Sequence, residues 1–110
     1  MVRLAGSAVV SLTEIDTSGY VGNPPGSASL TGIDNTVWPL SDPSAWFPLL
    51  PRTQLLPDTP HRFRLSDSRP VTHVRLDVFP DGGIARLRLH GSLTSAGLED
   101  MRRRWEETAG

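Results

Sequence analysis

The sequence predicts an all-β domain that is followed by a short C-terminal helix. Residues 8–16, 71–79 and 84–90 alternate apolar and polar side chains with the period of two that half-buried strands show. Ten prolines and ten glycines interrupt the chain, mostly between alternating segments. From residue 94 the apolar spacing changes to that of a helix. The length of 110 residues allows one domain, short for an all-β sandwich.

The elements before the central hairpin follow from composition and turn chemistry. Residues 8–16 are rich in Val, Ile and Thr and predict a strand. The segment DTSGYVGNPPG, residues 16–26, is typical of a turn, and a short strand is predicted at 27–34. Residues 35–60 contain six of the ten prolines and predict one long loop, because proline cannot donate a backbone hydrogen bond. Alternation resumes at 61–65.

The stretch VTHVRLDVFPDGGIARLRLHG, residues 71–91, predicts a β-hairpin. Its apolar side chains share a face only if Phe79 lies opposite Ile84, which leaves Pro80-Asp81-Gly82-Gly83 as the loop. On the polar face this register pairs Asp77 with Arg86, Arg75 with Arg88 and His73 with His90. Opposed arginines repel by a few tenths of a kcal/mol, about the scale of cross-strand pairs. This face is therefore either a solvated surface or a surface that holds an anion.

The tail predicts a helix over residues 94–107. Thr94 can cap it, and Leu98, Met101 and Trp105 form one apolar stripe. Because the stripe is short, we expect the helix to pack back on the sheet or on a neighbouring subunit.

Composition excludes some functions and leaves others open. The net charge is −1, which argues against a general binder of nucleic acid or of membrane surfaces. All eleven basic residues are arginine, and there is no cysteine. A metal would need His and carboxylate ligands, and no spacing indicates such a site. The N-terminal apolar stretch is too short and too polar for a leader or a membrane span, so we expect a cytoplasmic protein.

Three segments carry a resemblance to a known family. They are EIDTSGYVGNPPGSASLTG, LLPRTQLLPDTPHRF and THVRLDVFPDGGIARLRLHG, and they occur in this order. Together they resemble allantoicase, the ureide-hydrolysing enzyme of purine breakdown, and the tail GSLTSAGLEDMRRRW resembles the segment that follows the second of that family's two repeats. The resemblance implies a jelly roll of the galactose-binding-like type. Residues 1–110 would then be a single, partial repeat without its opening strands, and open sheet edges would favour a homo-oligomer or a complementing chain.

The resemblance also implies hydrolysis of allantoate to ureidoglycolate and urea, which makes the chain an amidine hydrolase of the allantoicase type. Allantoate is a small carboxylate with two ureido groups, so its site needs a guanidinium fork, hydrogen-bonding side chains and an acid or base. The candidates for the carboxylate are Arg75, Arg86 and Arg88, those for the ureido groups are Thr17 and Asn23, and those for proton transfer are Asp16, His73 and Asp81.

Each candidate has a structural alternative, because turns and solvated faces use the same residue types. Three hypotheses stay open: an allantoate hydrolase that works with another chain or as an oligomer, a non-catalytic jelly-roll module that binds a ureide or an anion, and an inactive truncated fragment. The expected ligand is a small ureide carboxylate; neither nucleic acid, membrane nor cofactor is implied.

Overall fold

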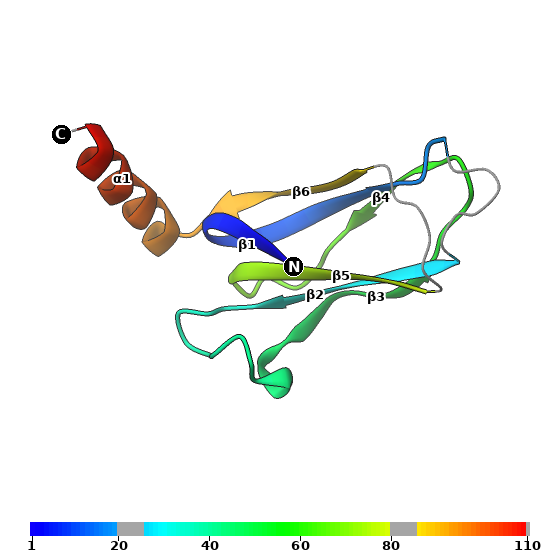
Figure 1. Ribbon diagram of the computed structural model, residues 1–110, viewed down its shortest axis with the longest axis horizontal. Helices are drawn as coiled ribbons and strands as arrows, with labels where there is room; N and C mark the ends of the chain where they lie inside the picture. Colours follow the sequence, from blue (N-terminus) through cyan, green and yellow to red (C-terminus); the bar gives the residue numbers. More distant parts are fainter. Residues whose placement is uncertain (20–25, 80–85, 110) are drawn as a thin grey trace.

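The computed structural model describes residues 1–19, 26–79 and 86–109 (Figure 1). Its elements in chain order are β1 (Val2–Asp16), β2 (Ser27–Ile33), a 3₁₀ turn (Pro43–Ala45), β3 (Phe47–Gln54), β4 (Pro60–Arg64), β5 (Val71–Phe79), β6 (Arg86–Leu93) and α1 (Ser95–Ala109). The all-β prediction with a C-terminal helix is confirmed. No helix among these residues is long and apolar enough to cross a membrane.

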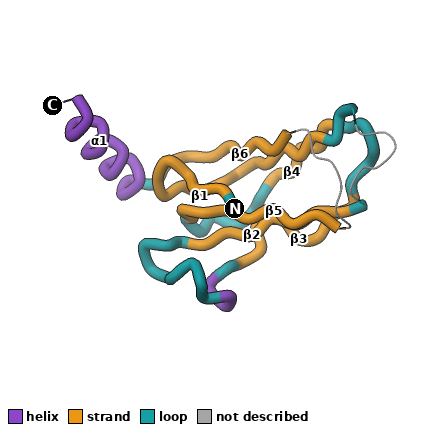
Figure 2. The backbone as a smooth tube through the Cα atoms, in the orientation of Figure 1, coloured by secondary structure: helices purple, strands orange, loops and turns teal. Residues whose placement is uncertain are grey.

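The described strands form one antiparallel sheet that curls over on itself. Its order is β3-β2-β5-β1-β4, and β6 also pairs with β1. The long strand β1 causes the curl, because its first residues pair with β5 while residues 8–16 pair with β6 and, towards the end, also with β4. Register shifts along β1 mark irregularities of the kind that bend a strand. The half containing β3, β2 and β5 therefore faces the half containing β6, β1 and β4 (Figures 1 and 2).

One hydrophobic core fills the space between the two halves. Ile15 of β1, Leu30 of β2 and Val74 of β5 are fully buried in it. The predicted apolar face of the segment 71–91 packs here, since side chains from both β5 and β6 contact this cluster. They are Val74, Leu76, Val78, Leu87 and Leu89. The alternate residues of both strands consequently point away from the core.

The predicted hairpin is wrong, because β5 and β6 are not neighbours. β5 lies between β2 and β1, whereas β6 pairs with β1. The pairing with β1 keeps the apolar residues of β6 inward and sets Arg86 opposite Asp16 and Arg88 opposite Glu14. It thus replaces the like-charge Arg75–Arg88 pair of the predicted register with an opposite-charge pair and gives Arg86 a different acidic neighbour. The predicted loop, residues 80–83, lies outside the described residues.

The prediction of one loop over residues 35–60 is also wrong, because it contains β3 and the 3₁₀ turn. Pro48 and Pro51 both lie within β3. Among the described strands, β3 pairs only with β2 and so forms an edge of the sheet, and an edge strand tolerates residues without an N–H on its open side.

The helix α1 begins one residue later than predicted and ends two residues later. The cap is confirmed, since the backbone N–H of Gly97 donates to Thr94 Oγ1 at 3.0 Å. Only the first part of α1 lies against β1, and the rest projects away from the sheet (Figure 1). Leu98 and Met101 accordingly remain 50% and 40% exposed, so they do not pack on the sheet, and packing of the helix on a neighbouring subunit stays a prediction.

Candidate functional site

The three arginines predicted to bind a carboxylate, Arg75, Arg86 and Arg88, do not lie together. Arg75 points outward from β5, and its Nε lies 3.0 Å from Asp77 Oδ2. Arg86 and Arg88 point outward from β6, which belongs to the facing half of the sheet. Because the core separates these two outer faces, one small ligand cannot contact all three side chains. The prediction that they form one site is wrong.

The arginines of β6 instead accompany the acidic residues of β1. Arg88 lies opposite Glu14, and on the other side of β1 Arg62 Nε lies 3.7 Å from Glu14 Oε2. Arg86 lies opposite Asp16. Like charges are therefore separated by carboxylates across three strands, which accounts for the crowding of arginine in β6.

Asp16 is held in its ionised form by this environment. Its Oδ1 accepts a hydrogen bond from the Ser18 N–H at 2.8 Å. The hydrogen bonds from Ser18 lower the pKa of Asp16 most, and the charges of Arg86 and Arg88 lower it further. A carboxylate of this kind suits a cross-strand ion pair better than the delivery of a proton at neutral pH.

Thr17 has a structural role in the described chain. It is fully buried, and its Oγ1 lies 2.7 Å from the Leu56 carbonyl oxygen and accepts a hydrogen bond from the Thr59 N–H at 3.0 Å. These contacts fasten the segment before β4 to the end of β1, and they do not present the hydroxyl to a ligand. Asn23 and Asp81 lie outside the described residues.

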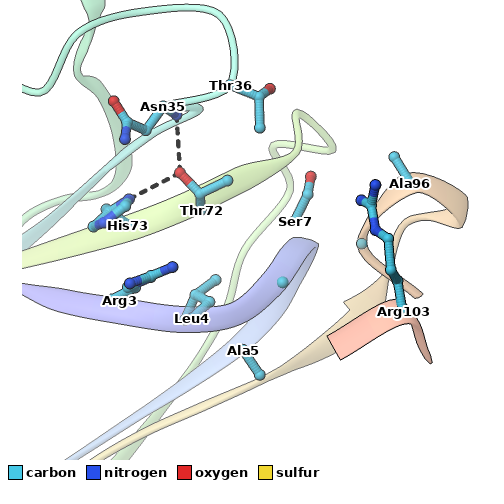
Figure 3. A pocket seen from close by; sticks show the side chains of 12 residues that line it. Arg3, Leu4, Ala5, Ser7, Asn35, Thr36, Thr72, His73, Ala96 and Arg103 are labelled. Carbon is cyan, nitrogen blue, oxygen red and sulfur yellow. Dashed lines mark hydrogen bonds between the residues drawn. The ribbon is translucent and has the colours of Figure 1, made fainter. Parts of the chain in front are cut away.

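His73 lies at the opposite end of β1 from Asp16, in a cavity of about 350 Å³ (Figure 3). This volume is within the range of small-molecule sites. We call it the Arg3–His73 cavity. The first residues of β1, the start of β5, the loop after β2 and the start of α1 form its walls. The lining residues are Arg3, Leu4, Ala5, Gly6, Ser7, Asn35, Thr36, Thr72, His73, Ala96, Gly97 and Arg103.

Strand pairing and a local turn place the polar groups of this cavity. His73 lies directly opposite Arg3 of β1. Thr72 Oγ1 lies 2.9 Å from His73 Nδ1 and accepts a hydrogen bond from the Asn35 N–H at 2.8 Å (Figure 3). The loop is shaped by Asp34, whose Oδ1 accepts a hydrogen bond from the Thr36 N–H at 3.0 Å. These contacts fix the imidazole and the loop relative to each other.

The Arg3–His73 cavity favours an anion. Arg3 and Arg103 contribute positive charge, and the described lining contains no Asp or Glu. Burial lowers the pKa of His73 most, and the nearby charge of Arg3 lowers it further. His73 is therefore neutral at pH 7 and able to accept a proton.

Sequence reasoning identified His73 but missed Arg3 and Arg103. Seventy positions separate Arg3 from His73, and no local pattern links them; only the pairing of β1 with β5 does. Among the residues that the structure describes, no group of three or more His, Asp or Glu side chains is placed to hold a metal ion.

Comparisons with known proteins agree on one family. The family model for the allantoicase repeat matches residues 1–94. A probable allantoicase of Streptomyces coelicolor is 43% identical over 108 residues, which are 98% of this chain and 27% of that protein. A probable allantoicase of Nocardia farcinica is 47% identical over 95 residues, which are 84% of this chain and 26% of that protein. The chain thus spans about a quarter of the length of these relatives.

Two solved allantoicase structures share the fold. One superposes with a TM-score of 0.69 at 27% sequence identity. The superposed region covers 82% of this chain and 26% of that allantoicase chain. The allantoicase of Saccharomyces cerevisiae superposes with a TM-score of 0.66 at 29% sequence identity. The superposed region covers 78% of this chain and 24% of the yeast chain. These likenesses confirm the predicted β-sandwich.

Proposed function

This chain belongs to the allantoicase family, and from that premise we propose that it takes part in the hydrolysis of allantoate to ureidoglycolate and urea. The observation that carries the proposal is the Arg3–His73 cavity, which combines positive charge with a neutral imidazole. Its size suits a ligand of a few carbon atoms rather than a polymer.

In the proposed complex the Arg3 guanidinium binds the carboxylate of allantoate. The side-chain amide of Asn35 supplies a donor and an acceptor to the ureido groups, and the Thr36 hydroxyl, which donates its own hydrogen to Asp34 Oδ1, accepts from a ureido N–H at the loop side of the cavity. Arg3 thereby takes the role that the sequence suggested for Arg75, Arg86 and Arg88.

His73 carries the proton in this proposal. It accepts a proton from water as the water oxygen forms a bond to the α-carbon of allantoate, and it returns that proton to the ureido nitrogen as the C–N bond breaks. The products are ureidoglycolate and urea, so atoms and charges balance. Asp16 lies at the far end of β1 and cannot share this step. Catalytic participation of Asp81 and ligand binding by Asn23 stay predictions.

We further propose that full activity needs a second copy or a complementing chain. Within the described residues, β6 and β4 each pair only with β1, so each offers an open edge to another strand. The chain also spans only about a quarter of its relatives, which leaves three quarters of their length to supply such strands. The cytoplasm is the proposed compartment, since a cysteine-free chain has no need of an oxidising one.

Urea release from allantoate tests the proposal. We would assay the purified chain alone, and mixed with the remaining segment of the Streptomyces coelicolor relative, using wild type and His73→Gln. Turnover that is lost in His73→Gln supports the mechanism. Thermal stabilisation by allantoate without turnover would favour the non-catalytic binding module instead. Neither turnover nor stabilisation would favour an inactive fragment and refute the proposal.

A further inference from the structure

The hydroxyl of Thr72 has three hydrogen-bonding neighbours in the wall of the Arg3–His73 cavity. The Asn35 backbone nitrogen lies 2.8 Å from its Oγ1, and His73 Nδ1 lies 2.9 Å from it (Figure 3). The third neighbour is the Ile33 carbonyl oxygen, at 3.3 Å. Strand pairing holds these groups in place, because Ile33 of β2 lies directly opposite His73 of β5. One hydroxyl therefore joins the end of β2, the loop that follows it and the imidazole.

The chemistry of two of these neighbours decides the role of the third. A hydroxyl donates one hydrogen bond and accepts up to two. A backbone N–H only donates, so Thr72 accepts from Asn35. A carbonyl oxygen only accepts, so Thr72 donates its one hydrogen to Ile33. The third contact is then a hydrogen bond only if His73 donates it, which requires a hydrogen on Nδ1 of the neutral ring.

The other tautomer of His73 forms one hydrogen bond fewer. With no hydrogen on Nδ1, the Thr72 hydroxyl turns its hydrogen to the ring and gives up its bond to the Ile33 carbonyl oxygen. Since one hydrogen bond between neutral groups shifts an equilibrium by about 3-fold to 10-fold, the three contacts of Thr72 favour the Nδ1–H form by about this factor.

We propose that Thr72 is a positioning residue, which holds neutral His73 in the Nδ1–H tautomer and so leaves Nε2 as the nitrogen that takes a proton. This inference rests on the proposed function for the reaction that uses the proton. In the part of the chain that the structure describes, Nε2 has no hydrogen-bond partner. Nε2 accepts the proton of the attacking water and returns it to the ureido nitrogen, whereas the hydrogen on Nδ1 stays bonded to Thr72 during both transfers.

NMR of the two ring nitrogens of His73 tests the proposal directly, because their shifts report which nitrogen carries the hydrogen when the ring is neutral at alkaline pH. Thr72→Val removes the hydroxyl but keeps a β-branched side chain of similar shape, which suits a strand. Thr72→Ser keeps the hydroxyl. Thr53→Val is the matched control, since the Thr53 hydroxyl donates to the Pro51 carbonyl oxygen at 2.7 Å and does not line the cavity.

We expect the Nδ1–H tautomer to dominate in wild type, Thr72→Ser and Thr53→Val. In Thr72→Val the ratio of the Nδ1–H to the Nε2–H form should fall by about 3-fold to 10-fold. The kcat for urea release, measured with the remaining segment of the Streptomyces coelicolor relative, should fall by a similar factor and recover in Thr72→Ser. A displaced loop alone would raise KM and leave the nitrogen shifts as they are in wild type, which would contradict the proposal.

The outcomes separate this inference from the proposed function. A wild-type ring with its hydrogen on Nε2, or the same tautomer ratio in wild type and Thr72→Val, overturns the role of Thr72 and leaves the proposed function to its own test. The expected nitrogen shifts without urea release by any mixture refute the proposed function and support the tautomer assignment.

Discussion

Replacing Arg3 by Gln should have two linked effects, one on the ligand and one on His73. A charge-assisted hydrogen bond contributes about 1.5–3 kcal/mol. Arg3 is exposed, so solvent screening favours the lower end of that range. A loss of about 1.5 kcal/mol corresponds to roughly a tenfold rise in the Kd for allantoate. The pKa of His73 should rise in the variant, because Arg3 lowers it in the wild type.

The pKa of His73 should not reach its ordinary value of 6.5 in Arg3→Gln, since burial is the larger cause of the shift and remains. The assay is an NMR titration of the His73 ring protons, combined with calorimetry of allantoate binding. Arg75→Gln is the matched control, because Arg75 also lies on the outer side but is paired with Asp77 and does not line the cavity. An unchanged His73 pKa in Arg3→Gln would refute the juxtaposition of these two side chains.

Three further predictions follow from the same contacts. The free energy of unfolding should fall as the pH drops below about 6.5, because the lowered pKa of His73 makes the unfolded chain bind more protons, and His73→Gln should flatten this part of the profile in urea titrations. Arg86→Gln and Arg88→Gln should leave allantoate affinity unchanged in calorimetry and destabilise the domain by less than about 1 kcal/mol each, as expected for exposed charges that face acidic residues on the neighbouring strand. A large loss of affinity would show that these residues belong to the binding site. Leu30→Ala should lower the free energy of unfolding by about 2–5 kcal/mol in urea denaturation, because Leu30 is fully buried, and a loss below about 1 kcal/mol would mean that the core closes over the gap.

The alternation of side chains was enough to predict the inner and outer faces of individual strands. Val74 and Leu76 on β5 and Leu87 on β6 face the core as their spacing indicates. The cap at Thr94 was likewise readable, because the residue that accepts the bond and the N–H that donates it are three positions apart. Each of these features depends on residues that are close in the chain.

The partner of each strand was not readable from the same pattern. The apolar side chains of β6 face the core whether the strand pairs with β5 or with β1. The short glycine-containing segment between β5 and β6 favours the prediction of a hairpin with β5, the nearer strand in the sequence. Beside β1, Arg86 and Arg88 lie opposite Asp16 and Glu14, which come more than sixty positions earlier in the chain, so no local pattern indicates this pairing.

The sequence by itself therefore determined the family, the β class, the inward faces and the cap, because these are properties of short segments. Only the tertiary structure decided which charged residues share a surface. The bent strand β1 brings Arg3 to His73 at one end of the molecule and Asp16 to Arg86 at the other. Contacts of this kind join positions far apart in the chain, and they form because the curled sheet buries one common core.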